Sequence, residues 1–448
     1  MLSSKKLLLQ KNSLNKKKYG FAAAISIVIA NMVGTGVFTS LGFQLMDLHN
    51  INALIFLWIL GGFIAILGSF CYAELSSAFP GSGGEYHFLR LSFNDSIGFL
   101  SGWASAFVAF AAPIAACAFA FSSYFENVFQ TGFDQRYLSV ALIVFVTLIQ
   151  MLNVHIGGRF QVYFTAGKIV LIVVLILAGY FYAPHLSAQS SGLTHQDFWK
   201  ALTLPAFWVG LIYVSYSYSG WNATAYIIDD IENPKKIVPR SILLGTLLVM
   251  VLYVLINHVF LITAPAAEMS GREDVAHVAA HYIFGAAGAK IISGMIAFFL
   301  ISSISSMTIV GPRVIKRISH DYRQFSYFSH VSKHHVPVRA ILLQSAIAII
   351  LLLTSSFSFI ITSVGVILSV FTTLTAIGLI VMRIKHPHTE RPIKVPFYPL
   401  TPLLFILFNL FTIGYFIVNK PTEALAGLVF LVVGFIIYLF LSPQHNEK

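Results

Sequence analysis

The chain has 448 residues, of which 57% are hydrophobic and 10% are charged. Because a soluble domain carries about 25% charged residues, this composition excludes an ordinary soluble protein and predicts an all-α polytopic membrane protein. The formal net charge of +11 would suit a nucleic-acid partner only if the basic residues formed one surface.

Twelve apolar segments have roughly the 17–25 residues that a spanning helix needs. We expect these helices over 20–44, 52–79, 96–125, 136–153, 160–182, 203–228, 239–263, 285–312, 338–354, 357–382, 397–417 and 423–441. The first segment is too long for a cleaved signal peptide, so we interpret it as a retained helix. Little more than Ser355 and Ser356 separates the ninth segment from the tenth, which predicts a tight hairpin.

The basic residues are unevenly divided between the two sides of these spans. Twenty-two of the 28 lysines and arginines lie in the tail over 1–19, in the loops after even-numbered spans or at Lys448. The opposite side holds five, and an excess of cations marks the cytoplasmic face. Both termini are therefore expected in the cytoplasm. The net charge is a topology signal, so we expect no nucleic-acid partner.

The first apolar segment contains Val33-Gly34-Thr35-Gly36-Val37 at its centre. A spanning helix normally satisfies every backbone polar group internally, because lipid offers no partners. Two glycines around a threonine weaken that pattern and indicate an interrupted helix. The free N–H groups of such a break can bind an anionic substrate at mid-membrane depth.

The sixth segment has a matching interruption, because hydroxyl residues surround the glycine of Tyr216-Ser217-Tyr218-Ser219-Gly220-Trp221. The two breaks lie 185 residues apart, which predicts two five-helix repeats over 20–182 and 203–382. An odd number of spans per repeat inverts the second one in the membrane. Helices over 397–441 and a tail over 442–448 complete the expected organisation. The glycines could instead only allow close helix packing, but their matched positions favour a binding site.

Five groups of motifs, in order over about residues 20–400, resemble those of the amino acid–polyamine–organocation (APC) superfamily of transporters. They are Val33-Gly34-Thr35-Gly36-Val37-Phe38; Tyr72-Ala73-Glu74-Leu75 with Phe79-Pro80-Gly81-Ser82-Gly83-Gly84-Glu85-Tyr86; Leu152-Asn153 through Gly157-Gly158 with Lys168; Tyr218-Ser219-Gly220-Trp221 with Glu232-Asn233-Pro234-Lys235 and Val238-Pro239-Arg240; and His386-Pro387, Arg391-Pro392 and Val395-Pro396. The resemblance implies that superfamily's 5+5 inverted-repeat fold, with helices 1 and 6 unwound around the substrate. It implies alternating-access transport of amino acids across the cytoplasmic membrane.

An amino acid substrate is a zwitterion, and the two breaks offer partners for both of its charges. The N–H groups of Thr35, Gly36 and Val37 can hold the carboxylate at a helix N-terminus, which glycine leaves open to close approach. Unwound carbonyls can accept from the ammonium, and the resemblance places Tyr216 where an aromatic ring closes over the substrate. The predicted substrate-binding residues are Ala30, Val33, Gly34, Thr35, Gly36, Val37, Tyr216, Ser219 and Gly220.

Lys168 is the main candidate for coupling transport to an ion. It lies about eight residues into the fifth segment, some 12 Å along a helix, and ionisable residues inside a membrane are functional candidates. The resemblance implies proton coupling, because some proton-coupled members of the superfamily carry a lysine where sodium-coupled relatives hold an ion. The alternatives are a snorkelling or structurally paired lysine, or a sodium site made by helix 8 hydroxyls. Those hydroxyls belong to Ser302, Ser303, Ser305 and Ser306.

The remaining polar residues favour structural or gating roles. Glu74, with Glu85 and Arg90, is expected at the inner end of the second helix, and Trp221 and Tyr216 are further gating candidates. The third helix has no acidic residue, so we favour neutral amino acids over the alternative of a cationic amino acid or polyamine exchanger. We expect no catalytic site, metal site, cofactor or accessory subunit. Cys71 and Cys117 lie in apolar segments and are interpreted as packing residues.

Overall fold

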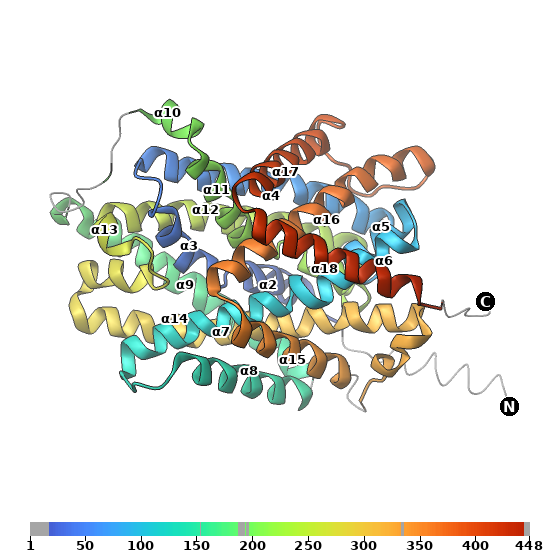
Figure 1. Cartoon of the computed structure of the whole chain (residues 1–448), viewed down its shortest axis with the longest axis horizontal. Coiled ribbons are helices and arrows are strands. Elements are labelled where there is room, and N and C mark those ends of the chain that lie inside the picture. Colours follow the sequence, from blue (N-terminus) through green and yellow to red (C-terminus); the bar gives the residue numbers. More distant parts are fainter. Residues whose placement is uncertain (1–17, 153, 187–192, 194–196, 333–335, 443–448) are drawn as a thin grey trace.

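A computed structural model describes residues 18–152, 154–186, 193, 197–332 and 336–442. Figure 1 shows a bundle of long helices, and the described residues form no β-strand. The predicted all-α fold class is therefore confirmed. The helices are α2 (Phe21–Met32), α3 (Gly36–Gln44), α4 (Ile51–Ala78), α5 (Glu85–Ser92), α6 (Asp95–Ala104), α7 (Ala111–Phe129), α8 (Gln135–Leu152), α9 (Val154–Leu186), α10 (Phe198–Thr203), α11 (Pro205–Tyr218), α12 (Pro234–Thr263), α13 (Ala266–Met269), α14 (Val275–Asp321), α15 (Val338–Thr354), α16 (Phe357–Lys385), α17 (Leu400–Asn419) and α18 (Pro421–Leu439).

Ten helical segments among the described residues are long and apolar enough to cross a membrane. Each of them overlaps one of the twelve expected spans. The span expected over 203–228 contains α11, which has only 14 residues because the chain leaves the helix after Tyr218. The span expected over 338–354 is α15, which has 17 residues. Twelve crossings therefore stay a prediction.

Two expected spans differ from the structure in their interior or their ends. The span predicted over 285–312 is part of α14, which has 47 residues and a non-helical Gly285 with φ of +72°. The span predicted over 96–125 is divided into α6 and α7 by a π-helical turn, Ser105–Ala109. Neither feature changes the apolar pattern on which the spans were predicted, so composition alone does not detect them.

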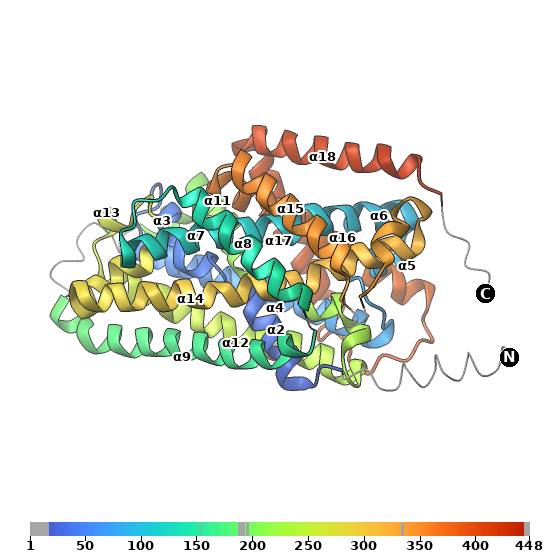
Figure 2. The ribbon, with the colours of Figure 1, turned by 90° about the horizontal axis from the view of Figure 1, so that it is seen from below.

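The first and last described residues lie at the same end of the bundle (Figures 1 and 2). The Arg323 N–H beyond the end of α14 donates to the Ser442 carbonyl at 3.2 Å, and the Tyr19 N–H donates to the Asp230 carbonyl at 2.8 Å. This agrees with an even number of crossings. Of the predicted tails, 1–17 and 443–448 lie outside the described residues, as does Asn153.

Three short helices beside the expected breaks, α2, α3 and α11, are packed inside the bundle. α2 packs against α9 and α12, α3 packs against α11, and α11 also packs against α4, α16 and α17. The residues of α3 are almost all buried, although three of its nine residues carry hydroxyl or amide groups. A segment that is both polar and central must find hydrogen-bond partners inside the protein. The polar groups of α3 therefore mark the place to look for a site.

Candidate functional site

The first expected helix is interrupted at the Gly-Thr-Gly segment. α2 ends at Met32 and α3 begins at Gly36, and the Gly34 N–H turns back to the Met32 carbonyl at 2.8 Å. Within the described part of the chain, no backbone carbonyl accepts a hydrogen bond from the N–H groups of Thr35, Gly36 or Val37. The first N–H groups of a helix have no partners inside that helix. The Gly36 and Val37 N–H groups therefore remain for another acceptor, whereas the Thr35 N–H is directed at the Cys117 thiol.

The second interruption follows α11. Gly220 has φ of +93°, a conformation that favours glycine, and the chain continues into a 3₁₀ turn, Ala223–Tyr226. A Cβ on Gly220 would lie 2.9 Å from the Asn31 carbonyl carbon, and a Cβ on Gly36 would lie 2.6 Å from the Ser217 Cα. The two interrupted helices therefore touch backbone to backbone at two points, and only glycine fits at either.

Side chains close the space beside the first break. The hydroxyls of Thr35 and Tyr216 lie 3.4 Å apart, and the Ser40 and Ser217 hydroxyls lie 2.8 Å apart. The cavity that remains there has a volume of about 10 Å³, which is enough for about one water molecule. Its lining includes Gly34, Thr35, Gly36, Tyr216 and Ser219 of the predicted set. In this conformation the break is covered.

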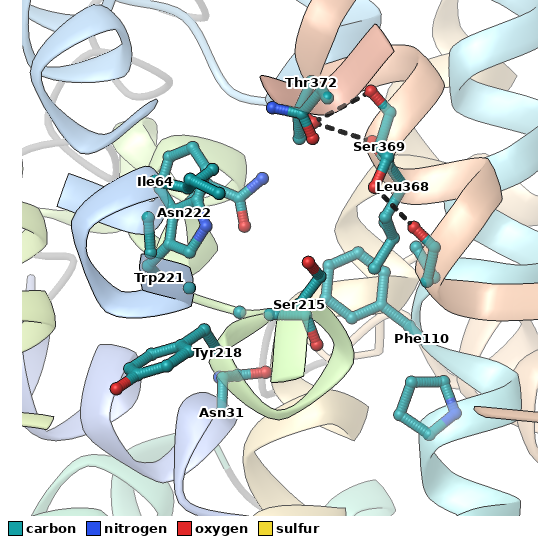
Figure 3. Close-up of a pocket in the computed structure, with 18 of the residues that line it drawn as sticks. Asn31, Ile64, Phe110, Ser215, Tyr218, Trp221, Asn222, Leu368, Ser369 and Thr372 are labelled. Carbon is teal, nitrogen blue, oxygen red and sulfur yellow. Dashed lines mark hydrogen bonds between the residues drawn. The ribbon is translucent and has the colours of Figure 1, made fainter. Parts of the chain in front are cut away.

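A larger pocket of about 70 Å³ continues from the second break. Figure 3 shows Trp221 and Asn222 on one side of it and Ser369 of α16 and Phe110 on the other. Ser219 and Gly220 of the predicted set also line this pocket, whereas Ala30, Val33 and Val37 line neither cavity. No Asp, Glu, Lys or Arg is among the described residues lining either cavity.

Several residues that line these cavities were not predicted. They include Asn31, Phe110, Pro113, Met307, Ser369 and Asn409. Asn31 had a detectable signal, because an amide two residues before the break is unusual in an apolar helix. Asn409 had no such signal in the sequence, because the helix that contains it, α17, was placed outside both predicted repeats. Trp221, a predicted gating residue, lines the pocket and packs edge-on against Tyr72 with ring centroids 4.7 Å apart.

Lys168 is paired inside the protein and reaches the first break. Its side chain is 4% exposed, and its Nζ donates to the Val33 carbonyl at 2.9 Å and to the Ser303 Oγ at 2.6 Å. The Ser303 hydroxyl donates to the same carbonyl at 2.9 Å. A carbonyl oxygen has two lone pairs, so Val33 has no acceptor left for a substrate ammonium. In this conformation, that part of the predicted binding set is occupied.

The other α14 hydroxyls that were considered as a sodium site also have partners. The Ser306 Oγ accepts from the Asn31 amide at 2.6 Å, and the Ser305 Oγ accepts from Gln150 at 2.5 Å. The Ser302 hydroxyl donates to the Phe299 carbonyl. Ser305 and Ser306 thus join neighbouring helices, which is the packing role that small polar residues have in membranes.

Glu74 lies in an ion-pair network away from both cavities. It is fully buried, with Arg383 at 2.5 Å and Arg391 at 3.1 Å, and it accepts from the Val395 N–H at 2.7 Å. The network ties α4 to the end of α16 and to the segment before α17. Its geometry suits a structural anchor.

We expect Glu74→Gln to lower the free energy of unfolding by about 3 kcal/mol, because removing one partner leaves buried arginine charge uncompensated. The measurement is the thermal unfolding midpoint of the full chain in detergent. Glu390→Gln, which changes an exposed glutamate beside Arg391, is the matched control and should leave the midpoint unchanged. If substrate KM changes while the midpoint does not, Glu74 is not an anchor.

Known proteins share this chain's sequence over almost its whole length. The sequence profile described as amino acid permease matches residues 19–441. The chain belongs to the amino acid permease family. The family consists of transporters, so the expectation that the chain is not an enzyme is confirmed, as is the APC resemblance.

Individual relatives of this permease are amino acid transporters. The mouse b(0,+)-type amino acid transporter 1 is 28% identical over 94% of this chain and 87% of its own length. The human large neutral amino acids transporter small subunit 2 is 28% identical over 97% of this chain and 82% of its own length. The mouse Asc-type amino acid transporter 1 is 26% identical over 97% of this chain and 82% of its own length.

The name of the human relative overturns one expectation. A small subunit is one chain of a larger assembly, so relatives of this permease include proteins that work with another subunit. The expectation that no accessory subunit is indicated is therefore wrong. The expectation failed for a physical reason. Helix patterns and buried motifs report on the inside of a bundle, whereas a partner subunit contacts the outside.

Proposed function

We propose that this permease moves neutral amino acids across the cytoplasmic membrane by alternating access around its two interrupted helices. The proposal includes twelve spans, inverted repeats over 20–182 and 203–382, two further helices over 397–441 and cytoplasmic tails over 1–19 and 442–448. The observation that carries it is the contact between the breaks, where the N–H groups of Thr35, Gly36 and Val37 lack backbone acceptors.

In this proposal the substrate carboxylate binds the free N–H groups at the start of α3, where the helix dipole also favours an anion. The present cavity of about 10 Å³ is too small for a carboxylate. Tyr216 must therefore move away from Thr35 before substrate enters and return to cover it. The carbonyls around Ser219 and Gly220 are the acceptors proposed for the ammonium, since that of Val33 is occupied.

The preference for neutral substrates is supported by the charge of the cavities. A cationic or anionic side chain in a buried pocket needs a partner of opposite charge, and the described lining of both cavities carries none. The human relative, named as a transporter of large neutral amino acids, points the same way.

Lys168 supports proton coupling. Its ammonium bridges Val33 and Ser303 at the junction of α9, α14 and the first break. A sodium ion placed there would meet a positive charge at close range, which is unfavourable in a medium of low dielectric constant. Loss of a proton would replace the charge-assisted hydrogen bonds of Lys168 by weaker neutral ones and loosen one of the two contacts to the Val33 carbonyl. Protonation of Lys168 would thereby alter the first break.

The decisive experiment is uptake by liposomes containing the purified full chain, with labelled neutral, cationic and anionic amino acids. We expect uptake or exchange of neutral amino acids without sodium, stimulated when the outside is more acidic than the inside. If no amino acid is transported or bound, the proposed function is wrong. Strict dependence on sodium would instead contradict only the coupling ion.

A further inference from the structure

Glu85 is a buried carboxylate that no cation neutralises among the described residues. It is the first residue of α5, and its side chain is 1% exposed. Its Oε1 accepts from the Tyr72 hydroxyl at 2.6 Å and from the Asn222 Nδ2 at 2.7 Å, and the Tyr226 hydroxyl donates to its Oε2. Because an ionised carboxylate can only accept, all three hydrogen bonds are satisfied by the charged form of Glu85.

The groups that face Glu85 come from three segments: Tyr72 from α4, Asn222 after α11, and Tyr226 from the following 3₁₀ turn. Burial raises the pKa of Glu85, and the hydrogen bonds from Tyr226, Tyr72 and Asn222 oppose that rise. The backbone supports the same contact, because the Gly84 N–H donates to the Ala225 carbonyl at 3.2 Å. Glu85 therefore holds the chain beyond the second break against α4.

This contact fixes which end of the Asn222 amide is available to the larger pocket. Asn222 lines that pocket, and its NH₂ group is used by Glu85. Its carbonyl oxygen makes no hydrogen bond within the described part of the chain. An amide held in this way presents an acceptor to a ligand.

The other amides of the pocket are oriented alike. The Asn31 Nδ2 donates to the Ile27 carbonyl and to the Ser306 hydroxyl, and the Asn409 Nδ2 donates to the Phe405 carbonyl at 2.8 Å. Every asparagine that lines the pocket thus donates at least one amide hydrogen to a protein acceptor, and Asn31 donates to two.

Three hydroxyls of the pocket follow the same pattern, whereas the Ser215 and Ser219 hydroxyls and the Trp221 indole N–H make no hydrogen bond among the described residues. Ser369 and Thr372 donate to carbonyls of their own helix, at 2.7 and 2.9 Å, as the dashed lines in Figure 3 show. Tyr218 donates to the Trp58 carbonyl at 2.9 Å. With their protons committed, these groups offer lone pairs to the pocket. Donor protons on a ligand would satisfy them, whereas an apolar ligand would leave them unpaired.

We propose that this pocket selects amino acids whose side chain donates a hydrogen bond, and that Glu85 is the positioning residue that turns the Asn222 carbonyl oxygen toward them. The inference rests on the proposed function, because the pocket is taken as the place of the substrate side chain. It narrows the substrate class from neutral amino acids to those with a hydroxyl or amide group.

The test is kcat/KM for matched substrate pairs in liposomes containing the full chain. Threonine with valine, and serine with alanine, differ in one hydroxyl. We expect the wild-type chain to prefer the hydroxyl member of each pair. Glu85→Gln should reduce that preference by about two- to tenfold, the range for one neutral hydrogen bond. The NH₂ group of the introduced glutamine can donate to the Asn222 carbonyl oxygen. The Asn222 amide can then turn and present a donor to the pocket instead of an acceptor.

Two further variants separate positioning from a general structural role. Asn222→Leu removes the acceptor itself and should lose the same preference, also serving if Glu85→Gln does not fold. Tyr72→Phe removes another hydrogen bond to Glu85 and leaves the Asn222 contact, so it should keep the wild-type preference. A merely structural role would lower transport of both members of a pair equally and leave their ratio unchanged.

A third pair, lysine with norleucine, tests the ammonium as an alternative donor. A preference confined to that pair would overturn the hydroxyl and amide class. A wild-type chain that transports amino acids without preference within any pair would overturn the inference and leave the proposed function standing. Unchanged ratios in Glu85→Gln and Asn222→Leu would overturn the role of Glu85. If the wild-type chain transports no amino acid, the proposed function fails first.

Discussion

Lys168→Met is expected to slow amino acid uptake by about tenfold or more and to abolish its dependence on external pH. The first effect follows from losing charge-assisted hydrogen bonds, worth about 1.5–3 kcal/mol each, to Val33 and Ser303. The second follows because methionine carries no proton. In the wild-type chain, uptake should rise as external pH falls, since a proton then enters with the substrate down its gradient.

The measurement is initial uptake into liposomes at a series of external pH values, without sodium. Lys290→Met removes an exposed lysine of α14 and should leave the wild-type pH profile intact. A Lys168→Met chain that keeps the full pH response would show that another group carries the proton. A chain that regains uptake only with sodium would favour the alternative sodium site among the α14 hydroxyls.

Gly36→Ala is expected to eliminate transport. The added Cβ would lie 2.6 Å from the Ser217 Cα and 2.6 Å from its Oγ, and backbone cannot yield as a flexible side chain does. Overpacking of this kind costs about 1–3 kcal/mol of stability, and the methyl group would also crowd the N–H groups proposed to hold the substrate carboxylate. Thermal unfolding and binding of a labelled neutral amino acid measure the two effects separately.

Gly414→Ala is the matched control, because a Cβ at that position of α17 meets nothing within 4 Å. It should leave both stability and uptake close to wild type. Full uptake by Gly36→Ala would mean that α3 and α11 are not held together at this point, and it would remove the main support for a two-helix site.

The sequence predicts the helices of this protein well where a single physical signal decides them. Apolar length placed the ten long spanning segments, because a bilayer demands that length whatever the packing. The same rule overestimated the sixth segment, where α11 ends at Tyr218 although apolar residues continue. Hydrogen bonding beyond Ser219 decides that end, and hydropathy does not measure it.

The site was predictable only in part, for the same reason. Glycines at 34, 36 and 220 signalled the breaks, because few other roles need glycine inside a spanning helix. The occupied state of the Val33 carbonyl was not predictable, since it depends on Lys168 and Ser303, which are both far from it in sequence. The orientation of Asn222 depends on Glu85, which the motif pattern placed only at the inner end of the second helix.

The closeness of the two breaks also bears on how the membrane keeps its voltage. Each elementary charge that crosses a membrane gains about 2.3 kcal/mol per 100 mV, so a transporter with a continuous water path would drain the gradient that drives it. Tyr216 lies against Thr35, and the cavity there has room for about one water molecule. In the proposed transport cycle, this contact between α3 and α11 would hinder the leakage of ions. Any motion that admits substrate on one side must keep an equally tight contact on the other.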